Sequence, residues 1–194
     1  FDAGRKRPLP TFPRRIAVIS SATGAAIQDV IATTAERCRS VSLLLIEVPV
    51  QGDGAATRIA DAIGWVNRHV ERLDVDAILV TRGGGSIEDL WAFNERVVAD
   101  ATYHSTLPIF AAIGHESDTT VIELVADLRA ATPTQAAMLL VPSAEEIARQ
   151  IEHQRDRLHL LVRKHAERGR AAVNALAARA PMREPRSTRV RPLC

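Results

Sequence analysis

The sequence has no apolar run long enough to cross a membrane. The longest candidate, residues 41–50, contains Glu47 and is well short of the roughly 20 apolar residues that a membrane helix needs. Cysteine is also scarce, because only Cys38 and Cys194 are present. Two thiols cannot form a disulfide framework, so we expect them to stay reduced in a cytoplasmic protein. Together with the lack of a fixed-period repeat, these absences exclude transmembrane, collagen-like and purely coiled-coil proteins.

From the start of the sequence we expect no secretory leader. The chain begins with Phe1 rather than Met, and no basic segment followed by an apolar one comes after it. A secretory signal peptide would need both features. We therefore expect that truncation, not the processing of a leader, accounts for this N-terminus.

The net charge of +2 is distributed unevenly along the 194 residues. Residues 1–15 hold five basic residues and one acidic residue, and residues 145–194 hold twelve basic and six acidic residues. The middle, residues 16–144, holds eight basic and sixteen acidic residues. This arrangement favours binding of a polyanion at the two ends, whereas the acidic middle by itself is no generic DNA-binding surface.

Short, β-branched apolar runs alternate with longer amphipathic segments from residue 15 onward. The runs predict buried parallel strands, and the segments predict helices. The predicted strands are residues 15–20, 41–50, 76–81 and 107–113, and the predicted helices are residues 25–37, 55–73, 86–101 and 119–128. These alternations with short connections predict an α/β fold, a doubly wound, mostly parallel sheet of the Rossmann-like type with right-handed crossovers.

The segments that flank this core differ from it in composition. A long helical stretch is predicted from about residue 135 to residue 180, and four of its apolar residues lie near heptad spacing, at positions 147, 151, 158 and 161. Such spacing predicts the start of a coiled coil. The expected regions are a basic lead-in at residues 1–14, the α/β domain at 15–142, the start of a coiled-coil helix at 143–180 and a disordered tail rich in Arg and Pro at 181–194.

Three polar segments follow the predicted strands, at residues 20–29, 82–89 and 114–118. Ligands of open α/β sheets bind beyond the carboxyl ends of the strands. Because parallel strands all end at the same edge, the topology gathers these three segments there. This edge is therefore the predicted site.

The middle segment is typical of a phosphate site. The glycines at 83–85 let the backbone approach a ligand. The helix that follows is opened by a predicted capping box, in which Ser86 caps and Asp89 reaches back, and it adds its positive end. Arg82 supplies a guanidinium that grips phosphate through two parallel hydrogen bonds. The predicted phosphate-binding residues are Arg82, Gly83, Gly84, Gly85 and Ser86. The alternative is a tight turn before a capped helix, with Arg82 in a structural ion pair.

The other two segments carry acid and base groups. His115 is suited to proton transfer near neutral pH, and Asp118, one helical turn further on, is placed to orient its imidazole. Asp29, in the second turn of the first predicted helix, lies either in the crevice or on an exposed helix surface. The alternative for His115 and Asp118 is structural capping. Carboxylates of this kind also bind Mg²⁺, although no dense cluster requires a metal, and the metal ligands stay unassigned.

Two aromatic residues after the glycines, Trp91 and Phe93, are candidates for base stacking. Aromatic side chains at such positions more often belong to a core or an interface. The sequence therefore leaves both interpretations open for these two residues.

Five segments carry most of these candidates. They are residues 19–29 (ISSATGAAIQD), 50–52 (VQG), 80–94 (VTRGGGSIEDLWAFN), 113–118 (IGHESD) and 126–134 (ADLRAATPT). In their order and spacing they closely resemble the signature of the exodeoxyribonuclease VII large subunit family, over roughly residues 8–145. A glycine triplet alone is weak evidence, whereas an ordered set of long motifs is specific.

The resemblance implies an enzyme that cuts single-stranded DNA from either end, releases oligonucleotides and works with several copies of a small helical subunit. The positions regarded as catalytic in the family match Asp29, Arg82, His115 and Asp118, and Ser117 stands where the family usually has Thr. The resemblance also implies an N-terminal OB-fold domain before the lead-in and a longer coiled coil than the one that begins here. We therefore expect a chain that is truncated at both ends.

Our hypothesis is an exonuclease core in which Arg82 and the Gly83–Gly85 amides hold the scissile phosphate. His115, oriented by Asp118, transfers protons, and Asp29 positions water or a metal ion. The alternatives are a non-catalytic nucleotide- or phosphate-binding module and an inactive truncated subunit.

Overall fold

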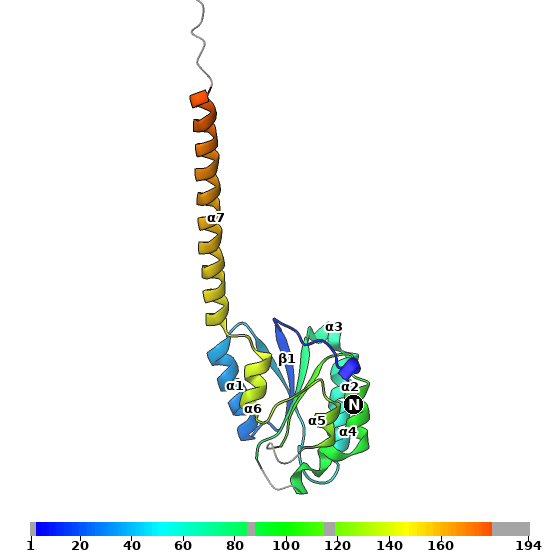
Figure 1. Ribbon diagram of the computed structural model, residues 1–194. Helices are drawn as coiled ribbons and strands as arrows, with labels where there is room; N and C mark the ends of the chain where they lie inside the picture. Colours follow the sequence, from blue (N-terminus) through cyan, green and yellow to red (C-terminus); the bar gives the residue numbers. More distant parts are fainter. Residues whose placement is uncertain (1–2, 85–87, 115–118, 180–194) are drawn as a thin grey trace, which may run out of the picture. The chain divides into compact units, whose positions relative to one another are not determined.

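The computed structural model describes residues 3–84, 88–114 and 119–179 (Figure 1). The chain divides into two compact units, Phe1–Glu146 and Ile147–Cys194. The first unit is the α/β domain with its lead-in, and the second consists of most of the last helix and the segment that follows it.

Five strands in the described residues form one sheet, in which every pairing is parallel. The strands are β1 (Arg15–Ser20), β2 (Ser42–Glu47), β3 (Ala77–Thr81), β4 (Ile109–Ala112) and β5 (Leu128–Arg129). Their order across the sheet is β2-β1-β3-β4-β5. The predicted doubly wound α/β fold is confirmed.

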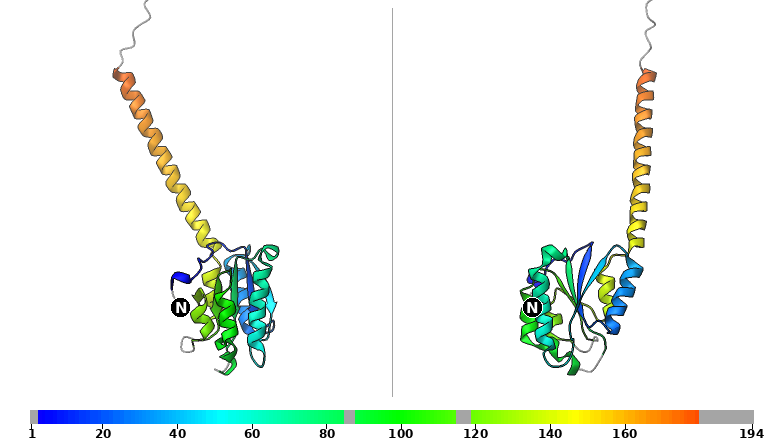
Figure 2. Two further views of the ribbon diagram at one scale, coloured as in Figure 1. Left: turned by 90° about the vertical axis from the view of Figure 1, so that its right-hand side faces the viewer. Right: turned by 180° about the vertical axis from the view of Figure 1, so that it is seen from behind.

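Helices cover both faces of this sheet, as the views in Figures 1 and 2 show. The described helices are α1 (Ala25–Arg37), α2 (Ala55–Arg68), α3 (Val70–Leu73), α4 (Arg96–Tyr103), α5 (Val121–Val125), α6 (Pro133–Leu140) and α7 (Ala144–Arg179), with 3-10 helices η1 (Ala3–Arg5) and η2 (Glu88–Asn94). One face packs against α1 and α6, and the other packs against α2, α4 and α5.

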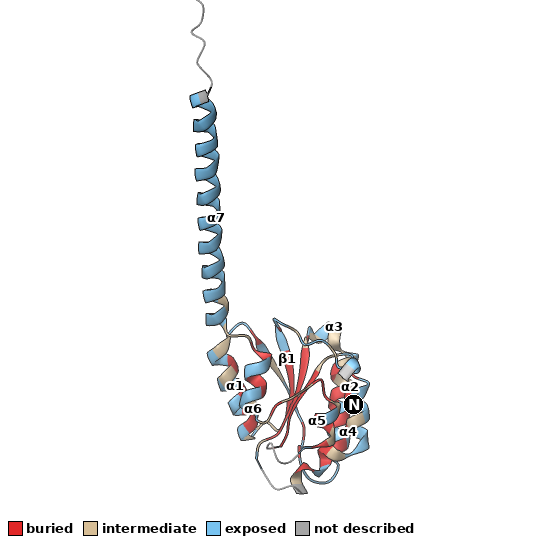
Figure 3. Ribbon diagram, in the orientation of Figure 1, coloured by how far each residue is buried: buried red, intermediate tan, exposed pale blue. Residues whose placement is uncertain are grey.

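Strand geometry explains the two apolar layers. Successive side chains of a strand point to opposite faces. In β1, Ile16 and Val18 therefore pack toward α1 and α6, whereas Ala17 and Ile19 pack toward α2. A strand that is covered on both sides has to be apolar throughout, and Figure 3 shows the central strands buried.

The sequence did not predict β5. The prediction of a helix over 119–128 is wrong in its second half, because α5 ends at Val125 and β5 follows. A capping box starts α5: the buried Glu123 carboxylate accepts hydrogen bonds from the Thr120 amide at 2.8 Å and from the Thr120 hydroxyl at 2.9 Å. A two-residue strand is too short to give a periodic signal.

Three predicted helices are interrupted. The one over 55–73 divides at His69 into α2 and α3. In place of one helix over 86–101, η2 and α4 meet at Glu95, which has an extended backbone. The long stretch from residue 135 is divided between α6 and α7, because Pro142 offers no amide hydrogen and keeps Val141 extended. The described part of the first unit is thus more segmented than its apolar pattern predicts.

The helix α7 is continuous over 36 residues, about 54 Å at the usual rise. Large apolar side chains stay exposed along it, among them Ile151, Leu158, Val162 and Val173. The predicted coiled coil needs a second helix against these side chains, so it stays a prediction. Within the described ranges, none of the helices combines the length and the apolar character needed to span a bilayer.

Candidate active site

The strand order places a switch point between β1 and β3. The chain leaves β1 into α1 on one face and leaves β3 toward η2 and α4 on the other face. Connections that part in this way open a crevice beyond the carboxyl ends of the two strands. Gly24 begins α1 at this edge, and Arg82 directly follows β3.

The loops after these two strands touch at Gly83. A Cβ atom built on Gly83 would lie 3.7 Å from the amide nitrogen of Ala26, at the start of α1. A Cβ atom on Gly84 would meet no atom within 4 Å. One glycine therefore closes the loop against α1, while the next leaves open space for a ligand to approach the backbone.

A cavity of about 80 Å³ lies next to these glycines. Its walls come from the loops after three strands, represented by Arg82 after β3, Gly114 after β4 and Thr132 after β5. The sheet therefore brings together loops that lie up to about 50 residues apart in the sequence. The cavity itself is smaller than a nucleotide, so only a group of phosphate size fits within it.

The Arg82 side chain is buried, with 3% of it exposed. Its Nη2 atom lies 3.0 Å from Oδ2 of Asp89 and 3.3 Å from Oε1 of Gln51. Its backbone amide donates to the Ala112 carbonyl at 3.2 Å. A guanidinium carries five N–H donors, which is more than these two contacts of Nη2 use, so it is suited to binding an anion in the cavity as well.

Sequence reasoning missed Gln51 as part of this site. Gln51 precedes a turn in which Gly52 and Gly54 have φ angles of 84° and 77°, in the left-handed region that favours glycine. This turn returns the chain from β2 toward α2 and places the amide of Gln51 against Arg82. The motif VQG at 50–52 was the available signal, but it suggested no role for the side chain.

Asp89 makes a contact that the sequence did not assign to it, because its Oδ2 pairs with Nη2 of Arg82. The predicted capping contact between Asp89 and Ser86 involves a residue outside the described ranges, so it stays a prediction. The ion pair of Arg82 that the alternative interpretation contained is present, whereas the turn and the Ser86 cap of that interpretation lie outside the described residues. Asp89 is 35% exposed, so solvent or a ligand can reach the pair from its side.

The start of α6 is a further part of the cavity that sequence reasoning missed. Thr132 and Pro133 line the cavity, and the Thr132 hydroxyl accepts a hydrogen bond from the Gln135 amide at 3.0 Å. Gln135 in turn accepts from the Ala131 amide at 2.6 Å. These contacts hold the N-terminus of α6, with its positive end, beside the cavity.

Several predicted residues lie outside the described ranges, namely Gly85, Ser86, His115, Ser117 and Asp118. Asp29 is described: it lies in the second turn of α1 with an exposed side chain. The structure thus brings Arg82 together with Gly83 and Gly84 and places Asp29 on the helix that contacts Gly83. No group of three potential metal ligands occurs among the residues that the structure describes.

The two aromatic candidates differ. Phe93 is fully buried and belongs to the core on the α2 face. Trp91 is 68% exposed, although its neighbours Leu90 and Ala92 are buried. A large exposed ring on an anchored segment, two residues after Asp89, is available for stacking.

The chain was also compared with known proteins. It matches the family described as "Exonuclease VII, large subunit" over residues 1–191. A protein named "Exodeoxyribonuclease 7 large subunit" from an Exiguobacterium species is 44% identical over 188 residues, which cover 97% of this chain and 41% of that protein. A protein of the same name from Syntrophotalea carbinolica is 52% identical over 153 residues, which cover 79% of this chain and 37% of that protein.

A third protein of this name, from Ralstonia nicotianae, is 46% identical over 192 residues, which cover 96% of this chain and 43% of that protein. The chain therefore spans about two fifths of the length of these curated relatives. The family match extends through the loops that form the cavity and through α7. On these grounds, the chain belongs to the exonuclease VII large subunit family.

Proposed function

We propose that this chain is the nuclease part of an exonuclease VII large subunit. It hydrolyses phosphodiester bonds of single-stranded DNA from either end and releases oligonucleotides in the cytoplasm. The observation that carries the proposal is the position of Arg82. A buried guanidinium lies at the switch point of the sheet, beside a glycine loop, with a carboxylate partner that a ligand can reach.

The scissile phosphate binds by replacing Asp89. A phosphate oxygen accepts from Arg82 where the carboxylate now lies, while Gln51 continues to accept from the same Nη2 atom and keeps the guanidinium in place. The amides of Gly83–Gly85 and the start of α6 add further positive potential. Once the phosphate has displaced Asp89, charge that develops on it in the transition state is stabilised by groups that are already in place.

His115, Asp118 and Asp29 supply the acid and base chemistry, in line with the family positions that they match. His115 transfers protons and Asp118 orients its imidazole, while Asp29 positions the attacking water. These roles require no metal ion, and we assign no step to one. An assay with excess chelator tests this point, because loss of cleavage that Mg²⁺ restores would place a metal ion among the carboxylates.

Trp91 stacks on a base of the strand next to the bound phosphate. Stacking suits a nuclease of this kind because every base presents a flat face, so binding does not depend on sequence. Partner chains bind elsewhere: the exposed apolar side chains of α7 are suited to packing against several copies of a small helical subunit.

End-labelled single-stranded DNA tests the proposal. The chain is incubated with it alone and with an added OB-fold domain and small subunit, next to a His115→Ala variant. We expect short oligonucleotides from the wild-type protein and a rate that is about 10²–10⁴ times lower for the variant. A variant that shortens DNA at the wild-type rate would refute the role of His115. Strand binding without any cleavage, even with the added parts, would instead support a binding module.

A further inference from the structure

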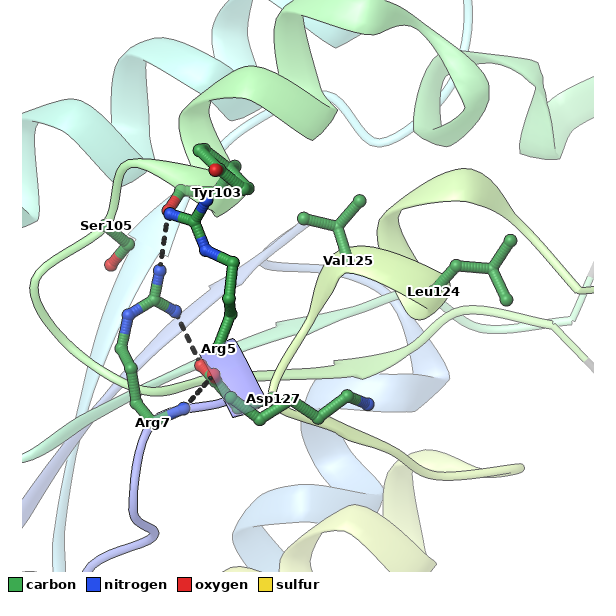
Figure 4. A pocket seen from close by; sticks show the side chains of 8 residues that line it. Arg5, Arg7, Tyr103, Ser105, Leu124, Val125 and Asp127 are labelled. Atoms are coloured by element: carbon green, nitrogen blue, oxygen red, sulfur yellow. Dashed lines mark hydrogen bonds and ion pairs between the residues drawn. The ribbon is translucent and has the colours of Figure 1, made fainter. Parts of the chain in front are cut away.

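A second cavity, of about 330 Å³, lies at the opposite end of the strands from Arg82, where their amino ends are. It is formed where the lead-in crosses the amino ends of β4 and β5. We call it the lead-in pocket and define it by Arg5, Lys6, Arg7, Tyr103, Leu124 and Asp127 (Figure 4). Its volume is within the range of small-molecule sites, about 300–1,000 Å³.

The lead-in is firmly attached at Arg7. The Arg7 amide donates to Oδ1 of Asp127 and its Nη1 donates to Oδ2, both at 2.6 Å. Nη2 of Arg7 donates to the carbonyls of Thr102 at 3.0 Å and Tyr103 at 2.9 Å. Because Asp127 also accepts from the Ile109 amide at 2.7 Å, this ion pair is tied to the first residue of β4. The neighbouring Arg5 and Lys6 are thereby held at the pocket.

The charges in the pocket favour an anion. Asp127 is neutralised by Arg7, with which it forms its ion pair. Arg5 and Lys6 make no ion pair with any described residue, and Arg5 lies over the Tyr103 ring with its Cζ 3.9 Å from the ring centre. Arg5 and Lys6 are adjacent cations that repel one another, so an anion that enters the pocket relieves this repulsion.

The opposite wall of the pocket is apolar. Figure 4 shows Tyr103 and Arg5 on one side of the pocket and Val125 and Leu124 on the other side. Leu124 is 44% exposed, at the end of α5. A ligand that contacts both the cationic wall and the apolar wall favourably has an anionic group next to a flat apolar group. A nucleotide with its phosphate and base has this combination, and single-strand binding sites pair cations with such surfaces.

We propose that the lead-in pocket binds a nucleotide of the single-stranded DNA substrate away from the bond that is cut. Arg5 and Lys6 contact the phosphates, and the base lies against Leu124 and Val125. This inference rests on the proposed function. The pocket and Arg82 lie at opposite ends of the strands, about 17 Å apart along the five residues of β3. A DNA strand must therefore be several nucleotides long to occupy both sites.

Binding of oligothymidylates tests the proposal, with strands of about 4 and about 20 nucleotides, at several salt concentrations. The double variant Arg5→Gln/Lys6→Gln should weaken binding of the long strand and leave cleavage of the short strand unchanged. Because each single-strand phosphate contact contributes about 0.7 to the salt slope, the slope should fall by about 1.4. The control, Arg39→Gln/Arg72→Gln, removes the same charge from two exposed positions outside the pocket and should leave the slope unchanged.

A second variant tests the apolar wall. Leu124→Ser leaves every charge in place, so it should weaken binding of the long strand without changing the salt slope. An unchanged slope in the Arg5/Lys6 variant, an equal loss in the control, or equal competition by polyglutamate would overturn the proposal. Cleavage of the short strand tests the proposed function separately, because cleavage requires only the Arg82 site, whereas a short strand cannot occupy both sites at once.

Discussion

Two arginine–aspartate pairs at opposite edges of the sheet differ in how tightly they are held. At the amino edge, Arg7 lies 2.6 Å from Asp127, whose side chain is 2% exposed. At the carboxyl edge, Arg82 lies 3.0 Å from Asp89, whose side chain is 35% exposed. In the first pair both partners make further hydrogen bonds that attach the lead-in. In the second pair the carboxylate is more exposed, and we propose that a ligand replaces it. An arginine–aspartate pair thus attaches the lead-in at the amino ends of the strands, and at the carboxyl ends a second such pair contains the guanidinium that we propose binds phosphate.

Removing the tight pair should have the largest effect on stability. Asp127→Ala leaves Arg7 without its counterion and the Ile109 amide without its acceptor, so we expect a loss of about 3–5 kcal/mol in the free energy of unfolding. Denaturant unfolding followed by circular dichroism measures it. Asp100→Ala is the matched control, because Asp100 forms an exposed pair with Arg96 and should lose only about 0.5 kcal/mol. Equal losses in the two variants would contradict the distinction between the two edges.

Removing Arg82 should act on cleavage instead. Arg82→Gln takes away the charge that stabilises the phosphate, so the rate of DNA cleavage should fall about 10²–10³-fold. Arg82→Lys keeps the charge but lacks the planar fork and should recover only part of the rate. Unfolding of both variants is measured in parallel. Wild-type cleavage by a folded Arg82→Gln protein would show that the carboxyl-edge pair is structural, like the other one.

The sequence predicted the carboxyl edge better than the amino edge, for physical reasons. Residues 82–84 directly follow a β-strand, so topology alone places them at the carboxyl ends of the strands. The bounds of α1 were also predicted correctly, because Gly24 and a regular apolar face define this helix. Arg7 and Asp127 are 120 residues apart, and no local pattern connects them. Asp89 was assigned to a helix start because acidic residues favour that position, and its contact with Arg82 depends on the tertiary fold.

Trp91 should contribute an intermediate effect at the carboxyl edge. Trp91→Ala removes a stacking surface, so binding of single-stranded DNA should weaken by about 1–3 kcal/mol per stacked base, while an abasic strand should bind as before. Fluorescence anisotropy of labelled strands measures both. Phe12→Ala is the control, because Phe12 is also an exposed aromatic residue but lies in the lead-in. A similar loss for the abasic strand would mean that Trp91 supports the loop and does not stack.

The smallest expected effect comes from the partner of Arg82. Asp89→Asn keeps the size of the side chain but removes the charge with which a phosphate competes, so short strands should bind about fivefold more tightly, near 1 kcal/mol. Titration with an oligothymidylate of about four nucleotides at low salt measures it. Weaker binding would indicate that Asp89 mainly orders the glycine loop.

The central claim is that Arg82 exchanges Asp89 for a DNA phosphate. Nitrogen-15 NMR of the arginine Nε groups tests it most directly, with the Arg82 signal assigned from the Arg82→Gln spectrum and a short oligothymidylate added. The account predicts that the Arg82 signal moves as the strand binds, whereas that of the exposed Arg96 stays in place. A strand that binds while the Arg82 signal remains unchanged would contradict the account.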